Sequence, residues 1–197
     1  MRILHLGCGR KKLDAPTLLG SLGLAMPEST DAEILHLDSD KRLEPDLICH
    51  LGAEDIPLED NSVDLAIGWH VLEHIGSQTA RGAAEWFNFW EELYRVLKPA
   101  GWLFAECPYY TSIWAWSDPT HTRAISECSF YFFDQDCYRI AGSMISPYRI
   151  ACDFQWLSIA GGLEKGWALL PDTHEPKHTS IRFALSARKP LRPWWEA

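Results

Sequence analysis

The chain has 197 residues, 47% of them hydrophobic and 23% charged, and this length predicts one domain that buries a full core. Its 27 acidic and 18 basic side chains give a net charge of −9, which argues against a general affinity for nucleic acid, because that affinity needs a basic surface. No apolar run approaches the ~18 residues that a membrane span needs, and the chain starts directly with a core-like strand, so we expect a cytoplasmic protein. The six cysteines form no Cys-x-x-Cys pair, which favours reduced thiols over disulfides or a zinc site.

Apolar runs alternate with helical stretches along the chain, which is typical of an α/β protein with a mostly parallel sheet. The runs predict strands at residues 2–6, 33–37, 46–50, 63–69 and 102–107, and then an antiparallel pair at 149–159 and 180–189.

The clearest predicted helix covers residues 79–97, where apolar side chains recur every three or four positions. Pro99 and Gly101 are expected to end it. A helix within residues 13–26 is expected to be short or irregular because proline and glycine interrupt it, and another is predicted at 127–142.

The start of the chain has the pattern of a nucleoside site. A short apolar strand runs into Gly7-Cys8-Gly9, and the second predicted strand ends on Asp38. Glycines let the backbone turn tightly and approach a ligand, and a carboxylate at the end of the next strand accepts hydrogen bonds from ribose hydroxyls. The pattern is short, so its weight depends on the later segments of the chain.

Four segments in this order resemble the class I S-adenosylmethionine-dependent methyltransferases, in particular the small type 11 subgroup. They are residues 4–9, 37–38, 54–74 and 93–101. The resemblance implies a Rossmann-like, doubly wound, mostly parallel α/β sheet of seven strands whose last strand is antiparallel. It also implies S-adenosyl-L-methionine as the cofactor. We expect residues 1–197 to form a single domain of this kind, with an acceptor-side loop and helix insertion around residues 108–142.

The resemblance assigns cofactor binding to seven positions, which are Gly7, Cys8, Gly9, Asp38, Ala53, Glu54 and His70. The glycine turn matches the segment that passes under the methionine part of the cofactor, and Asp38 matches the acid that holds the ribose. Ala53 and Glu54 fall where the family contacts the adenine. His70 falls beside the methionine and sulfonium end.

Three positions depart from the pattern of the family. His5 stands where an acid usually precedes the glycines, Lys11 replaces the third glycine, and Gly52 replaces an aspartate that reaches the adenine amine in many members. Each departure weakens one contact, while the backbone donors of the glycine turn remain. They leave open a second interpretation, a catalytically inactive binding module that kept the fold.

Residues that come after the fourth and fifth strands are the candidates for the acceptor side, because ligands of open α/β sheets lie outside the carboxyl ends of the strands. The segment 108–123 combines aromatic side chains with Asp118, His121 and Arg123. The ordinary pKa of histidine suits a general base at neutral pH, so we expect His121, supported by Asp118, to be catalytic. The alternative is a capped turn with a structural histidine.

His70-Val71-Leu72-Glu73-His74 also spells His-x-x-Glu-His, the inverted zinc-peptidase pattern. A related alternative is a metal-assisted RNA 2′-O-methyltransferase, since that family uses Glu-x-x-Glu-His with a distant histidine, here His121. The pattern lies inside a methyltransferase-like segment and its first position differs, so we expect no metal. Glu73 and His74 then brace the following helix.

These observations predict a methyltransferase that transfers a methyl group to oxygen or nitrogen of a small or medium polar acceptor. A nucleic acid or a membrane is not expected as a partner, because neither a basic groove nor an amphipathic surface helix is evident. The oligomeric state and the identity of the acceptor stay open.

Overall fold

The computed structural model describes residues 1–21, 31–77, 82–141, 146, 148–157, 167–168 and 180–196. Its strands are β1 (Arg2–Leu6), β2 (Glu33–Asp38), β3 (Leu47–Ile48), β4 (Val63–Trp69), β5 (Leu97–Pro108), β6 (Phe154–Leu157), β7 (Trp167–Ala168) and β8 (Ser180–Ala187). The helices are α1 (Ala15–Ser21), α2 (Gly82–Val96), α3 (Trp114–Ser117) and α4 (Gln135–Ala141). Four 3-10 turns are η1 (Lys41–Leu43), η2 (Leu72–His74), η3 (Glu127–Phe133) and η5 (Trp194–Glu196).

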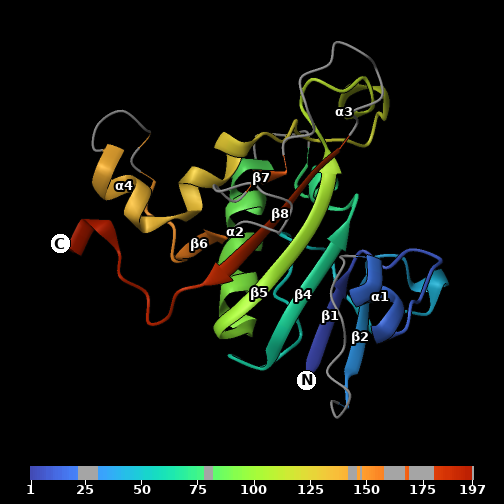
Figure 1. Ribbon diagram of the computed structural model, residues 1–197. Coiled ribbons are helices and arrows are strands. Elements are labelled where there is room, and N and C mark those ends of the chain that lie inside the picture. Colours follow the sequence, from blue (N-terminus) through green and yellow to red (C-terminus); the bar gives the residue numbers. More distant parts are fainter. Residues whose placement is uncertain are drawn as a thin grey trace.

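The strands form one sheet in the order β3-β2-β1-β4-β5-β8-β6, and the two-residue β7 also pairs with β8 (Figure 1). Strands β1 to β5 run parallel to one another, whereas β8 runs antiparallel between β5 and β6. The predicted doubly wound sheet with an antiparallel last strand is therefore confirmed. The chain leaves β1 in one direction towards β3 and returns on the other side at β4, so the sheet has a switch point between β1 and β4.

Helices α1 and α2 cover opposite faces of the sheet (Figure 1). Successive side chains of β1 point to opposite faces of the sheet, and each face has its own hydrophobic cluster. Ile3 packs in the cluster that contains α1, whereas Leu4 and Leu6 pack in the cluster that contains α2. Both faces of a central parallel strand are buried, which explains its continuous apolar sequence. None of the described helices is long and apolar enough to cross a membrane.

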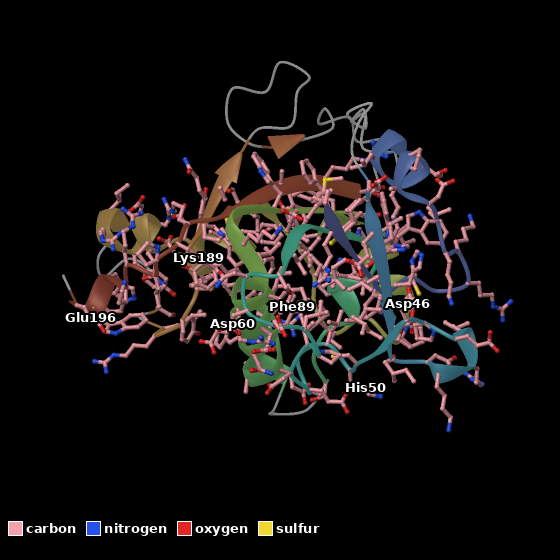
Figure 2. All side chains as sticks on the ribbon, turned by 90° about the horizontal axis from the view of Figure 1, so that it is seen from below. Asp46, His50, Asp60, Phe89, Lys189 and Glu196 are labelled. Atoms are coloured by element: carbon pink, nitrogen blue, oxygen red, sulfur yellow. The ribbon has the colours of Figure 1, made fainter. Side chains whose placement is uncertain are left out.

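Aromatic side chains fill the larger cluster between the sheet and α2. The Trp90 ring stacks on Phe133 with 4.4 Å between ring centroids, and Trp86 meets Trp90 edge-on at 5.3 Å. Phe89 of the same helix is fully buried, and Figure 2 shows it in the middle of the packed side chains. The chain has ten tryptophans, a high number for 197 residues, and some of them therefore belong to the core.

Two predicted helices differ from the observed ones. The helix expected at 79–97 is described from Gly82 and ends at Val96, because Leu97 already pairs with Val63 at the start of β5. The expected stop at residues 98–101 is thus part of a long strand with an irregular register. The helix expected at 127–142 is divided into η3 and α4, because Asp134 adopts an extended conformation. Its carboxylate then accepts from the amide of Asp136 and caps α4.

Other predicted elements agree more closely. Strands 2–6 and 63–69 are observed with the predicted bounds, and the antiparallel pair is observed as β6 and β8. The third strand, predicted at residues 46–50, is observed only at Leu47–Ile48. Parts of the predicted segments 13–26, 79–97, 127–142 and 149–159 lie outside the described residues.

Candidate functional site

A pocket of about 420 Å³ lies at the carboxyl ends of β1, β2, β3 and β4, beside the switch point of the sheet. Its volume falls in the range of small-molecule sites. The residues that line it are Gly7, Leu37, Asp38, Ser39, Cys49, His50, Leu51, Ala53, His70, Val71, His74, Ile75, Gly76, Ser77 and Glu85.

The glycine turn closes onto the end of β2. Gly7 and Gly9 both have φ of +57°, a left-handed conformation that favours glycine. A Cβ atom on Gly7 would lie 2.5 Å from Cγ2 of Val71, whereas one on Gly9 would meet nothing within 4 Å. The amide of Cys8 donates to the carbonyl of Leu37 at 3.0 Å. The turn is therefore held by backbone bonds, and Gly7 is also required for close packing.

Asp38 presents its carboxylate to this pocket. Oδ2 accepts from the amide of Gly9 at 2.9 Å, and Oδ1 accepts from the amide of Asp40 at 3.0 Å. Each carboxylate oxygen has a second lone pair, so the fixed group can still accept hydrogen bonds from a vicinal diol. This donor set fits the ribose of an adenosyl cofactor.

The loop after β3 forms another wall. Ala53 lines the pocket, whereas Glu54 does not and instead accepts from the amide of His50 through Oε2 at 2.8 Å. Gly52 has φ of +87°, and a Cβ atom there would lie 2.3 Å from the carbonyl oxygen of Glu85. The aspartate expected at this position has no room in this chain, which explains the departure from the family pattern.

Cys8, Gly9 and Glu54 do not line the pocket, although each contacts a residue or turn that does. His5, where the family carries an acid, is also absent from the lining. It is buried within the sheet, with its Nδ1 atom 3.1 Å from Nδ1 of His36, and burial lowers its pKa to about 4.

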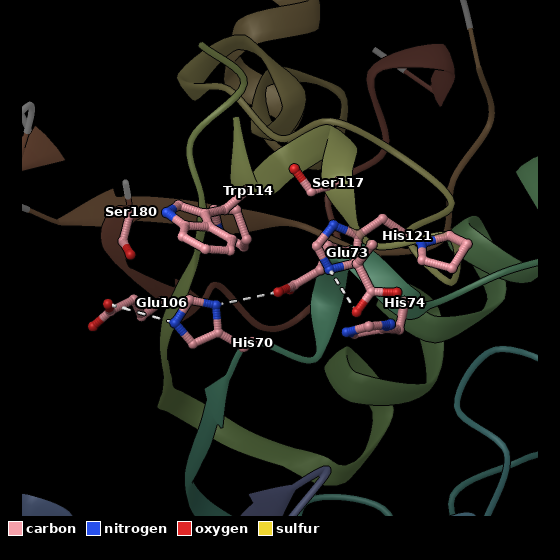
Figure 3. A pocket seen from close by; sticks show the side chains of 11 residues that line it. His70, Glu73, His74, Glu106, Trp114, Ser117, His121 and Ser180 are labelled. Atoms are coloured by element: carbon pink, nitrogen blue, oxygen red, sulfur yellow. Dashed lines mark ion pairs between the residues drawn. The ribbon is translucent and has the colours of Figure 1, made fainter. Parts of the chain in front are cut away.

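A second pocket, of about 720 Å³, adjoins the first at the carboxyl ends of β4 and β5 (Figure 3). His70 and His74 line both pockets, so they stand at the boundary between them. Its lining residues are His70, Glu73, His74, Glu106, Pro108, Trp114, Ser117, Asp118, Pro119, His121 and Ser180. We call it the acceptor-side pocket.

His70 lies between two carboxylates. Its Nδ1 atom is 3.3 Å from Oε1 of Glu73, and its Nε2 atom is 3.7 Å from Oε1 of Glu106, as Figure 3 shows. The contact with Glu73 raises the pKa of the imidazole, against the effect of burial, and Glu106 adds to the rise. His70 has φ of 49°, an uncommon conformation for a histidine that directs the chain around the pocket boundary.

His121 and Asp118 both line the acceptor-side pocket. Nδ1 of His121 lies 3.2 Å from the carbonyl oxygen of Ala115, and a carbonyl only accepts, so Nδ1 carries the proton of the neutral ring. Nε2 of His121 is 4.0 Å from Oδ2 of Asp118, an ion-pair distance and not a hydrogen bond. Hydrogen bonds from Thr120 lower the pKa of Asp118.

Arg123, the third polar residue expected on the acceptor side, does not line the acceptor-side pocket. Its guanidinium lies over the ring of Trp86, 4.1 Å from the ring centre, and donates to the carbonyl of Ile75. Glu106 and Ser180 line the pocket but are not among the residues predicted from the sequence. Glu106 lies within the predicted fifth strand near its carboxyl end, and Ser180 begins the antiparallel β8, which brings its amino end to the same edge.

Comparisons with known proteins agree with this geometry. The model of a methyltransferase domain matches residues 4–105, slightly more than half of the chain. The structure is similar to one chain in the structure of a complex between the Trm112 methyltransferase activator of Haloferax volcanii and a methyltransferase, with a TM-score of 0.53 and 16% identity over 95% of this chain and 82% of that chain.

It is also similar to a SAM-dependent methyltransferase from Methanosarcina mazei, with a TM-score of 0.52 and 15% identity over 95% of this chain and 92% of the other. No curated protein matches the chain in sequence. The structural likenesses show the fold, and the match over residues 4–105 shows the family. The chain therefore belongs to the type 11 methyltransferase domain family and is a class I methyltransferase that depends on S-adenosylmethionine.

Proposed function

We propose that this methyltransferase methylates an oxygen or nitrogen atom of a small or medium-sized polar acceptor. The observation that carries the proposal is the boundary between the two pockets. The smaller pocket has the carboxylate that suits a ribose, and the larger one opens beside it across His70 and His74. An acceptor in the larger pocket is therefore adjacent to the reactive end of a cofactor in the smaller one.

We assign a part of the cofactor to each of the residues that were predicted to bind it. S-adenosylmethionine supplies an electrophilic methyl group when it is bound. In our proposal the turn Gly7-Cys8-Gly9 passes under its amino-acid part, Asp38 holds its ribose, and Ala53 and Glu54 belong to the loop beside its adenine. His70 belongs to the wall between the sulfonium and the acceptor.

The composition of the acceptor-side pocket supports a polar acceptor. Carboxylates, imidazoles and hydroxyl groups form most of the wall, and Trp114 supplies one apolar surface. In well-oriented reactions, holding the acceptor in line with the methyl group lowers the barrier by about 7–11 kcal/mol. A typical catalytic base contributes 10²- to 10⁴-fold in rate, which is about 2.7–5.4 kcal/mol. The shape of this pocket thus matters more than any one proton acceptor.

An oxygen or nitrogen acceptor loses a proton during the transfer, and we assign its removal to His121 and Asp118. The hydrogen bond from Nδ1 of His121 to Ala115 fixes the ring so that Nε2 has the lone pair. Asp118 lies 4.0 Å from that atom and stabilises positive charge on it. The net charge of −9 agrees with a small cytoplasmic acceptor and not with nucleic acid.

Two measurements test the proposal. Calorimetry with S-adenosylmethionine and with its demethylated product should give one site in each case. Transfer of a labelled methyl group should then be measured against a panel of small hydroxyl, carboxyl and amine compounds. Turnover on at least one of them, lowered at least 100-fold by His121→Ala, is expected. Cofactor binding without turnover on any acceptor would favour the inactive binding module, and full turnover by His121→Ala would remove its assigned role.

A further inference from the structure

The acceptor-side pocket contains a cluster of three metal-ligating side chains. Glu73, His74 and His121 each offer one ligand atom, and these atoms all lie within 4.8 Å of one another. Glu73 and His74 belong to η2, which comes after β4, whereas His121 comes from the loop after α3. Figure 3 shows Glu73, His74 and His121 grouped on one side of the pocket, with the carboxylate of Glu73 turned towards His70. Segments almost 50 residues apart thus bring nitrogen and oxygen ligands to one point.

Glu73 gives an independent reason to expect a cation. Its side chain is 1% exposed, and neither carboxylate oxygen has a hydrogen bond of good geometry among the residues that the structure describes. One basic nitrogen, Nδ1 of His70, lies 3.3 Å from its Oε1. His70 thus pairs with one side of the carboxylate, but a buried carboxylate without hydrogen bonds is costly, and such groups in proteins are usually compensated further or bound to a metal.

The two histidines are oriented as metal ligands usually are. The hydroxyl of Thr120 donates to the carboxylate of Asp118 at 2.6 Å, so its oxygen accepts from Nδ1–H of His74 at 3.0 Å. Nδ1–H of His121 donates to the carbonyl of Ala115. In both neutral rings Nε2 therefore has the lone pair. Hydrogen bonds of this kind to the other ring nitrogen fix the tautomer and orientation of histidines that bind metals.

The ligand types limit the identity of the cation. Imidazole suits zinc, copper, iron or nickel better than it suits magnesium or calcium, which take oxygen ligands. Three protein ligands beside a pocket leave a coordination position for a further ligand, as in catalytic zinc sites. We infer that Glu73, His74 and His121 bind a divalent first-row transition-metal cation in the acceptor-side pocket.

This inference departs from the expectation of no metal, and its consequence for catalysis rests on the proposed function. A cation at this point would orient an acceptor hydroxyl and make it more acidic. In that state His121 acts as a ligand, and Asp118 remains 4.0 Å from it as the nearby proton acceptor. Metal binding itself does not depend on turnover, so the two proposals are tested separately.

The test uses the untagged full-length protein after treatment with a chelator. Calorimetry with Zn²⁺ should show one equivalent bound, and Co²⁺ should produce visible absorption bands in the same stoichiometry. Each of the variants Glu73→Gln, His74→Gln and His121→Gln is expected to bind at least 100-fold more weakly. Exposed His50 lines the smaller pocket but lies outside the cluster, so it provides the matched control for metal binding alone, and His50→Gln should bind the metal like the wild type.

Three results would overturn the inference. One is the absence of stoichiometric binding to the wild type, another is binding that survives His74→Gln and His121→Gln, and the third is equal loss in His50→Gln. His74 is exposed, so its variant tests the site even if Glu73→Gln does not fold. Calorimetry with S-adenosylmethionine on the same samples separates the proposals, because cofactor binding without metal binding contradicts only this inference.

Discussion

The carboxylate of Asp38 accepts a hydrogen bond from the backbone amide of Gly9, with 2.9 Å between N and Oδ2, although 29 positions separate the two residues. The bond joins the turn after β1 to the end of β2. It orients the acid before any cofactor arrives, so little ordering is left for the binding step.

Asp38→Ala should weaken binding of S-adenosylmethionine on the order of 10- to 100-fold, because hydrogen bonds to a charged group contribute about 1.5–3 kcal/mol. Titration calorimetry measures this directly. Asp40→Ala is the control: its carboxylate binds Arg42, and the backbone amide that Asp38 uses is retained. Equal losses in the two variants would contradict the assigned role of Asp38.

The variants Gly7→Ala and Gly9→Ala allow a controlled comparison of the free energy of unfolding. Both glycines have φ of +57°, so alanine at either position costs about 1–2 kcal/mol in the left-handed conformation. Only Gly7→Ala also places a Cβ atom 2.5 Å from Val71, and overpacking adds about 1–3 kcal/mol. Urea unfolding should therefore show a larger loss for Gly7→Ala than for Gly9→Ala. The reverse order would show that the turn relaxes around Val71.

Burial of His5 predicts a stability that falls in mild acid. Its native pKa is about 4 and its ordinary value is 6.5, since burial and the neighbouring His36 outweigh the opposite effect of Asp38. Below pH 6.5 His5 takes up a proton in the unfolded chain but not in the native protein. The free energy of unfolding therefore decreases as the pH falls, until about pH 4. The decrease amounts to at most about 3 kcal/mol.

The free energy of unfolding, measured between pH 7 and pH 4, should decline less steeply in His5→Leu than in the wild type. His50→Gln, at an exposed position, serves as the control and should keep the wild-type slope. If His5→Leu also kept the full slope, the acid sensitivity would have another source.

Arg123 should matter for stability and not for the acceptor. It stacks on Trp86 and donates to the carbonyls of Ile75 and Gly82, so Arg123→Met should lower the free energy of unfolding by about 2–4 kcal/mol. Arg2→Met, which breaks a largely exposed pair with Glu33, should cost less than about 1 kcal/mol. Chemical denaturation compares them, and similar small losses would refute a structural role for Arg123.

The sequence was most informative where local pattern and tertiary environment agree. Strands β1 and β4 were predicted with the observed bounds because they are buried apolar runs with clear ends. The position of Asp38 at the pocket followed from the pattern of a glycine turn and a second strand that ends on an acid. Local periodicity did not reveal that Asp134 divides the helix expected at 127–142, because the division depends on a side chain that caps the second half.

The acceptor side was harder to predict because distant segments build it. The sequence from His70 to His74 matches the inverted zinc-peptidase pattern, but in the structure His70 has φ of 49° and precedes a short 3-10 turn. Its partner Glu106 and the neighbour of His74, His121, come from later segments. No spacing in one sequence encodes these contacts.

Gly52 has a consequence for the wall of the smaller pocket. The loop after β3 approaches α2 so closely that a Cβ atom on Gly52 would lie 2.3 Å from the carbonyl oxygen of Glu85, and the side chain of Asn88 fastens the same loop by donating to the carbonyl of Gly52. An acid at position 52 of this chain would push the loop away from α2. The close contact between loop and helix therefore limits how wide this end of the pocket can become.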